Sequence, residues 1–148
     1  MARRYVIDTC VLMNYFTAVF GERPFLSTKV RELLDMAFAG CSSILISIPA
    51  IVFIEVFEKW FNSEEFARQF HYEVFAPLTA LENVEIRPVD KEIMQAMLTV
   101  QTGDDGVSEL HDRVVLASAI ALRCPLLTRD TVITNYVSRN HPIPGVYC

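Results

Sequence analysis

The segment RYVIDTCVLMNYF, residues 4–16, predicts a buried strand that ends at an acid and leads directly into a helix. Tyr5, Val6 and Ile7 form the apolar run of the strand, Asp8 follows it, and a helical pattern begins at Thr9. In open parallel sheets, ligands bind beyond the carboxyl ends of the strands. Asp8 is therefore a candidate site residue, although Asp8 or Thr9 would serve equally well as a simple cap of the helix.

Short apolar runs and longer helical segments alternate along the rest of the chain, which indicates an α/β fold with a mostly parallel sheet wrapped by helices. The expected strands are Arg4 to Ile7, Ser43 to Ile48, Val84 to Ile86 and Pro125 to Thr128. The expected helices are Thr9 to about Phe20, Ser27 to Ala39, IPAIVFIEVFEKW at 48–60, Asn62 to Leu81, Lys91 to Gln101, Glu109 to Arg123 and Thr131 to Ser138. The chain then returns through HPIPGVYC.

Several residues signal where these helices begin, end or break. The signals are Gly40 ending one helix, Pro49 in the first turn of the next, Asn62 with Glu65 as a capping box, Pro77 as a break, and Asp90 as a cap. After Asp90, the residues Ile93, Met94 and Met97 recur on one helical face, which predicts the buried side of that helix.

The composition bounds the class of protein. With 148 residues, 52% of them hydrophobic and 21% charged, the chain is expected to form one domain over residues 1–148. It has neither a run of ~20 apolar residues nor a secretory cleavage pattern, so we expect a soluble, cytoplasmic protein with reduced cysteines. The net charge of −5 argues against a protein coated in positive charge, but it does not exclude a nuclease whose acids surround a cation.

Three further acids lie in positions comparable to that of Asp8. Asp130 repeats the strand-end pattern after Leu126 to Thr128. Glu55 lies inside a helix that is apolar almost all round, where a solvated acid is unusual. Asp112 precedes an apolar stripe at helical spacing, which directs its carboxylate to the rim of the core. The alternative for Glu55 is a buried acid paired with an arginine or bonded to a hydroxyl.

Several carboxylates gathered in one cleft repel each other, so they require protons, basic partners or a hard cation. Mg²⁺ and Mn²⁺ prefer oxygen ligands, and Mg²⁺ commonly bridges protein carboxylates and substrate phosphates. The three histidines, His71, His111 and His141, do not have the spacing of a known zinc-binding motif. An all-acid cluster therefore points to phosphodiester chemistry.

Four segments together resemble the PIN-domain ribonucleases, a family that includes the toxins of bacterial and archaeal toxin–antitoxin pairs. They are VIDTCVLMNYF around Asp8, SIPAIVFIEVFE around Glu55, ELHDRVVLASAIAL around Asp112, and LLTRD ending at Asp130. They occur in the family's order and approximate spacing, from the start to the end of the chain.

The resemblance implies a three-layer α/β/α sandwich and RNA cleavage with one or two Mg²⁺ or Mn²⁺ ions. It makes Asp8 and Asp112 the central metal ligands, Asp130 a direct or water-mediated ligand, and Glu55 a ligand or an orienter of the attacking water. It makes Thr128 the hydroxyl that steadies the acids. Cys10 departs from the pattern, because such proteins often carry asparagine there. The resemblance also implies an antitoxin protein and a homodimer as partners.

Other residues have two readings. Glu109 is either a fifth acid near the site or a first-turn acid that favours the helix dipole. Arg113 and Arg129 either contact phosphate or pair with neighbouring acids. The aromatic residues Phe57, Trp60, Phe61, Phe66, Phe70 and Phe75 are expected to be mostly core, with an excess that indicates a subunit or partner interface.

Two alternatives to a nuclease are an enzyme of another class and a binding module without catalytic activity. Receiver domains and haloacid-dehalogenase-like phosphatases also place aspartates at strand ends. The phosphatases need a second Asp where this chain has Cys10. Receivers need a paired acid beside the first strand and a lysine late in the chain, whereas the last lysine here is Lys91. The non-enzymatic alternative is a PIN-like module that binds RNA or a partner without cleaving. The four acids favour the nuclease, because a disused site has no physical reason to keep groups that repel each other.

Overall fold

The fold is built on a five-stranded sheet in which every pairing is parallel, described in a computed structural model for residues 2–16 and 25–148. The strand order is β3-β2-β1-β4-β5. The strands are β1 (Arg3–Ile7), β2 (Ile44–Pro49), β3 (Val84–Arg87), β4 (Leu126–Leu127) and β5 (Val146–Tyr147). The expected mostly parallel sheet is confirmed.

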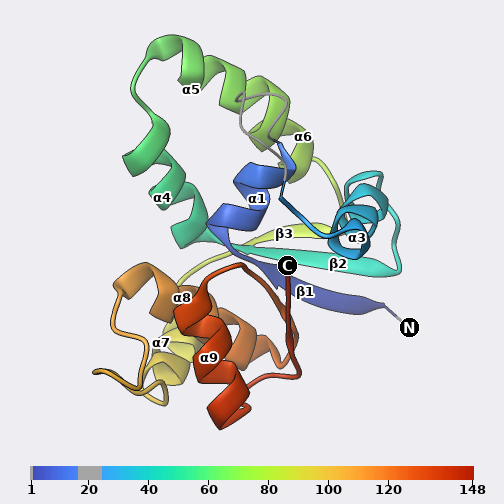
Figure 1. Ribbon diagram of the computed structural model, residues 1–148. Helices are drawn as coiled ribbons and strands as arrows, with labels where there is room; N and C mark the ends of the chain where they lie inside the picture. Colours follow the sequence, from blue (N-terminus) through green and yellow to red (C-terminus); the bar gives the residue numbers. More distant parts are fainter. Residues whose placement is uncertain (1, 17–24) are drawn as a thin grey trace.

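Helices cover both faces of the sheet (Figure 1). On one face lie α1 (Thr9–Tyr15), α3 (Thr28–Phe38), α4 (Ala50–Trp60), α5 (Glu64–Phe70), the π-helix η1 (His71–Phe75) and α6 (Ala76–Thr79). On the other face lie α7 (Lys91–Met97), α8 (Leu110–Leu122) and α9 (Thr131–Asn140). The result is the expected three-layer α/β/α sandwich.

The central strands show why two helical layers are needed. Val6 and Ile7 are consecutive in β1, so their side chains point to opposite faces, and both are fully buried. Ile46 and Ile48 of β2 are fully buried on one face, while Leu116 of α8 is fully buried above β1 and β2 on the other side of the sheet. A strand buried on both faces is typical of parallel sheets covered by helices.

The sheet grows first on one side of β1 and then on the other. The chain adds β2 and then β3 on one side of β1, and afterwards crosses over to place β4 and β5 on the other side. The helices before and after this crossover lie on opposite faces, as right-handed connections require. The carboxyl ends of β1 and β4 therefore meet at a topological switch point, which is where ligands bind in open α/β sheets.

The helices differ from the predictions in several details. Ser63 rather than Asn62 caps α5, because its hydroxyl accepts the Phe66 N–H. Pro49 is the last residue of β2 and precedes α4, rather than lying in its first turn. α7 ends at Met97 rather than at Gln101. Met94 is exposed, although it was predicted to share the buried face with Ile93, which is buried. The predicted extension of the first helix over residues 17–20 lies outside the described residues.

Pro77 does not end the helical stretch but changes its winding. A proline cannot donate a backbone hydrogen bond, and its ring crowds the carbonyl of the preceding turn. The turn before Pro77 is the wider π-helical turn of η1, in which the Ala76 N–H donates to the His71 carbonyl. Gly40 has φ +91° directly after α3, the left-handed position expected for a glycine that ends a helix.

Two further findings concern the last strand and the helices. β5 was not predicted, because a two-residue strand that follows Pro144 and Gly145 carries no periodicity. Among the described residues, no helix is both long enough and apolar enough to cross a membrane.

Candidate functional site

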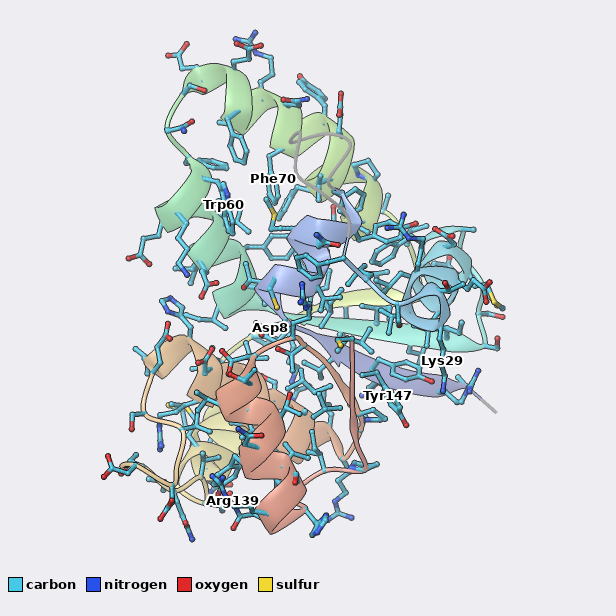
Figure 2. All side chains as sticks on the ribbon, in the orientation of Figure 1. Asp8, Lys29, Trp60, Phe70, Arg139 and Tyr147 are labelled. Atoms are coloured by element: carbon cyan, nitrogen blue, oxygen red, sulfur yellow. The ribbon has the colours of Figure 1, made fainter. Side chains whose placement is uncertain are left out.

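The two strand-end acids lie at the switch point. Asp8 follows β1 and is 7% exposed, and its position between the upper and lower helices is visible in Figure 2. Its Oδ1 accepts the Thr9 N–H at 2.7 Å. Asp130 follows β4 and caps α9, because its Oδ1 accepts the Ile133 N–H at 2.9 Å. Capping and site roles are therefore compatible, since a cap occupies only one of the roughly four acceptor positions of a carboxylate.

The two helical acids reach the same place from opposite layers. Glu55 comes from α4 and Asp112 from the first turn of α8, and these helices contact each other beside the strand ends. One pocket of about 260 Å³ holds all four acids. It is lined by Asp8, Cys10, Glu55, Lys59, Glu109, Asp112, Arg129 and Asp130. We call Asp8, Glu55, Asp112 and Asp130 the acidic quartet.

The electrostatics of the pocket penalise negative charge. Burial raises the pKa of Asp112 from 3.8 to about 7, with further increases from Asp130, Glu109, Asp8 and Glu55. Burial also raises the pKa of Asp8, and the charges of Glu55 and Asp130 add to this effect. Each acid is thus close enough to oppose ionisation of another. Such a cluster gains most from a bound cation, which removes the repulsion.

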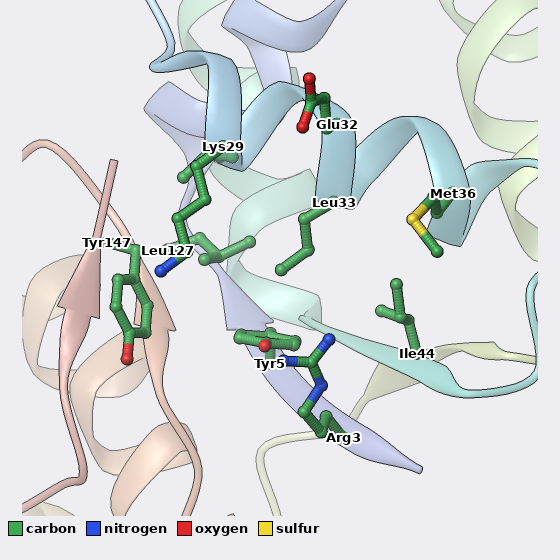
Figure 3. A pocket seen from close by; sticks show the side chains of 10 residues that line it. Arg3, Tyr5, Lys29, Glu32, Leu33, Met36, Ile44, Leu127 and Tyr147 are labelled. Atoms are coloured by element: carbon green, nitrogen blue, oxygen red, sulfur yellow. The ribbon is translucent and has the colours of Figure 1, made fainter.

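The donor set fits a hard divalent cation. The quartet presents carboxylate oxygens, which are the preferred ligands of Mg²⁺ and Mn²⁺. Another hollow, of about 250 Å³, lies between α3 and the sheet (Figure 3). Its lining includes Arg3 and Lys29 and only one acid, Glu32, so it does not offer this chemistry.

Thr128 connects the two strand-end acids. Its hydroxyl donates to Asp8 Oδ2 at 2.6 Å and accepts the Asp130 N–H at 3.1 Å. The hydrogen bond to Asp8 lowers the pKa of that carboxyl and so opposes the effect of burial. The Cys10 thiol lies 3.7 Å from Asp8 Oδ2, which makes it a weak donor where the resemblance expects an asparagine.

Glu109 lines the pocket and adopts the cap position of α8 rather than a place in its first turn. Its side chain makes no capping hydrogen bond, and its charge raises the pKa of Asp112. Glu109 is therefore a fifth acid beside the quartet, and its position at the start of α8 is also favourable to the helix dipole.

The two arginines have different positions. Arg129 lines the pocket, and its guanidinium carbon lies 3.8 Å from the centre of the Phe25 ring. Arg113 does not line the pocket. Its guanidinium donates to the carbonyls of Met97, Val100 and Val107 at 2.8 to 3.1 Å. The phosphate-contact interpretation of Arg113 is therefore corrected, because this side chain binds the end of α7 and the loop between α7 and α8.

Arg113→Ala is expected to lower the free energy of unfolding by about 2–3 kcal/mol, because three partly buried carbonyls lose a charged donor. The melting temperature should fall by about 5–10 °C in a calorimetric or fluorescence melt. Arg129→Ala is the matched control and should cost at most about 1 kcal/mol, the value of an exposed cation–π contact. A wild-type melting temperature for Arg113→Ala would contradict this role.

Sequence reasoning missed two residues beside the acids. Lys59 Nζ lies 3.5 Å from Glu55 Oε1, and the four-residue spacing on α4 could have indicated this pair. His111 Nδ1 lies 3.6 Å from Glu55 Oε2. This second contact depends on how α8 packs against α4, which no local spacing reveals. Glu55 therefore has basic partners, as its alternative reading supposed, although they are Lys59 and His111 rather than an arginine.

The family model of the PIN domain matches residues 5–137 of the chain. Solved structures with a similar fold include VapBC2 from Rickettsia felis bound to a DNA fragment from their promoter, with a TM-score of 0.61 over 98% of this chain and 99% of that chain. They also include FitAcB from Neisseria gonorrhoeae, at 0.62 over 97% and 96%, and VapBC-1 from nontypeable Haemophilus influenzae, at 0.55 over 96% of each. The sequence identity is 14% in each case, so these likenesses concern the fold. A comparison with curated protein sequences gives no match.

Proposed function

The chain belongs to the PIN-domain family, whose members are nucleases, and from this membership we propose that it is a metal-dependent endoribonuclease and the toxin of a toxin–antitoxin pair. The observation that carries the proposal is the convergence of the acidic quartet on one pocket at the switch point of the sheet. Family membership supports cleavage of nucleic acid. The choice of RNA rests on the resemblance to the toxins.

Asp8, Asp112 and Asp130 would hold the cation, and Glu55 would complete the ligand set or orient the attacking water. A bound Mg²⁺ or Mn²⁺ supplies Lewis acidity and neutralises charge on the phosphate. The chain's own part is positioning. Thr9 and Thr128 fix the two oxygens of Asp8, and the cap of α9 fixes one oxygen of Asp130.

Two cationic side chains at the pocket would serve the RNA backbone. Arg129 and Lys59 line the same pocket as the acids. Guanidinium groups contact phosphate oxygens well, so Arg129 is positioned to hold a phosphate beside the reacting bond. Lys59 is paired with Glu55 and would exchange this partner for a phosphate only when Glu55 turns to the cation.

The test is incubation of the purified chain with structured and single-stranded RNAs in Mg²⁺, Mn²⁺ or EDTA. We expect cleavage with either ion, products that carry a 5′ phosphate, and no cleavage in EDTA. Cleavage that EDTA leaves unchanged would contradict the metal mechanism. Binding of RNA without cleavage in either ion would favour the alternative, a PIN-like module that binds RNA or a partner.

Thr128→Val is expected to slow cleavage by about 10-fold or more near neutral pH, because the charged Asp8 loses a hydrogen bond worth about 1.5–3 kcal/mol. Losing this donor raises the pKa of Asp8 further, so the rate should recover partly as the pH rises. Thr128→Ser keeps the hydroxyl and is the matched control. Rate–pH profiles for the three proteins measure the effect, and a wild-type profile for Thr128→Val would contradict it.

The proposed protein partners would use α4 and α5, which lead away from the sheet and turn back above α1 (Figure 1). Ile54, Phe57 and Phe61 of this region are 40 to 52% exposed. Next to them is a hollow of about 210 Å³ with an aromatic lining. Phe70 is fully buried, so it belongs to the core, and the exposed Phe57 and Phe61 remain as candidates for the interface. The similar folds come from VapBC and FitAcB complexes, which supports an antitoxin as partner.

We also propose that the isolated chain forms a homodimer. Exposed apolar patches of this kind commonly mark protein interfaces. Sedimentation at micromolar concentration should show a dimer, and Phe57→Asp should shift it toward monomer if α4 lies in the interface. A monomer in the wild type at that concentration would contradict the dimer.

A further inference from the structure

A second group of potential ligands lies beside the acidic quartet and includes a histidine. His111, in the first turn of α8, faces Glu55 and Glu58 of α4 and its own neighbour Glu109. Its side chain is 22% exposed, and that of Glu55 is 13% exposed. Two helices from different layers thus bring one imidazole and three carboxylates together.

The distances in this group suit a shared ion better than direct hydrogen bonds. His111 Nδ1 lies 3.6 Å from Glu55 Oε2 and 3.6 Å from Glu109 Oε1, beyond the usual range of a hydrogen bond. The three ligand atoms lie within 4.8 Å of one another. Ligands at about 2.1 Å from a common metal are separated by roughly 3.0–3.5 Å, so a small adjustment of side chains would complete the coordination.

The other side of the imidazole faces a further carboxylate. His111 Nε2 lies 3.8 Å from Glu58 Oε2. A histidine that binds a metal through one nitrogen almost always donates its other N–H to a carboxylate, a carbonyl or water, which fixes its tautomer and orientation. At 3.8 Å the two groups are not hydrogen-bonded, and Glu58 would take this role after a shift of about 1 Å toward Nε2, the nitrogen that neither Glu55 nor Glu109 faces.

We propose that Glu55, Glu109 and His111 form a second divalent-cation site, beside the quartet, that takes a zinc-class transition metal in preference to Mg²⁺. An imidazole nitrogen suits Zn²⁺ and similar ions, whereas Mg²⁺ favours oxygen ligands alone. Glu58 orients His111 in this site. The inference rests on the proposed function only through Glu55, which belongs to both groups.

Glu55 offers one oxygen to this site. Its Oε2 faces His111, while Oε1 faces Lys59 at 3.5 Å. Lys59 therefore pairs with the oxygen that the second site does not use. A protonated His111 could instead act only as a counter-ion to the three carboxylates, and measurement of metal affinity separates the two roles.

The experiment measures Zn²⁺ and Mg²⁺ affinities of the metal-free chain near pH 7, by competition with a chromophoric chelator and by calorimetry. We expect Zn²⁺ to bind at least about 100-fold more tightly than Mg²⁺. His111→Gln should weaken Zn²⁺ binding by more than about 10-fold and Glu58→Gln by about 10-fold, with little change for Mg²⁺. His141→Asn, at an exposed histidine, is the matched control and should change neither affinity.

Direct evidence comes from NMR of the chain labelled with ¹⁵N-histidine, in which Zn²⁺ should shift the Nδ1 resonance of His111. Equal Zn²⁺ affinity in the wild type and His111→Gln would overturn the proposal. Asp8→Asn tests the quartet separately, because Asp8 is not a ligand of the second site. If Asp8→Asn leaves Mg²⁺ affinity unchanged while His111→Gln still weakens Zn²⁺ binding, the proposed function fails and the second site stands.

Discussion

Asp8→Asn and Asp112→Asn are each expected to slow metal-dependent RNA cleavage by about 1,000-fold, the largest loss that removal of one electrostatic group commonly causes. Each change removes a charge that the cation requires, while the side chain keeps its size. In Asp8→Asn, the amide oxygen can still accept the Thr9 N–H, and the amide N–H₂ can donate to the Thr128 hydroxyl. The fold should therefore survive.

Cleavage of a labelled RNA under single-turnover conditions measures this loss, and circular dichroism checks the fold. Asp104→Asn is the matched control, since it is the same substitution at an exposed loop residue outside the pocket. Near wild-type cleavage by a folded Asp8→Asn or Asp112→Asn protein would remove the quartet from the mechanism.

The metal-free protein is expected to lose stability as the pH rises from about 5 to about 8, and a divalent cation should reverse the loss. Burial raises the pKa of Asp112 from its ordinary 3.8 to about 7 in the folded chain. The folded state therefore binds the proton more tightly than the unfolded state. The resulting stabilisation is complete below about pH 4 and is lost as the pH rises through about 7.

The size of this effect is limited because Asp112 is only half-buried. The full pKa difference corresponds to about 4 kcal/mol, which solvent screening reduces to about 1–2 kcal/mol. The melting temperature of the metal-free chain should thus fall by about 3–6 °C between these pH values. At the higher pH, Mg²⁺ or Mn²⁺ at 100 times its dissociation constant should add about 2.7 kcal/mol, or about 5–10 °C.

Asp112→Asn separates this linkage from the other titrating groups. The variant should be more stable than the wild type at pH 8 without metal, should lose most of the decline with pH, and should gain little from added cation. Thermal melts of both proteins with EDTA and with Mn²⁺ give the comparison. A metal-free wild type that becomes more stable toward pH 8 would contradict the repulsion inferred for the quartet.

Much of the fold was predictable because its strands are short apolar runs with strong local signals. Residues 5–7 are all apolar, and four of the five residues at 44–48 are apolar, which indicates buried strands. The misassigned cap at Asn62 shows the limit of such signals. Asn62 and Ser63 are both good capping residues, and only the backbone geometry selects Ser63.

The site was predictable to the extent that each acid has a local context. The apolar surroundings of Glu55 and the strand end before Asp8 are visible in the sequence, and both residues line the pocket. The position of His111 was not predictable, because it depends on the contact between α4 and α8 across some fifty residues of sequence. Arg113 was misjudged for a similar reason, since its three carbonyl partners are at the end of α7 and in the loop that follows, and no local spacing links them to Arg113.

Anomalous diffraction from crystals of the chain grown with Mn²⁺ tests most directly whether the acidic quartet is a cation site. We expect a Mn²⁺ peak within about 2.5 Å of carboxylate oxygens of Asp8 and Asp112, with Asp130 bound directly or through water. The peak should disappear in Asp8→Asn crystals. A wild-type crystal saturated with Mn²⁺ that shows no ion between Asp8 and Asp112 would contradict the account.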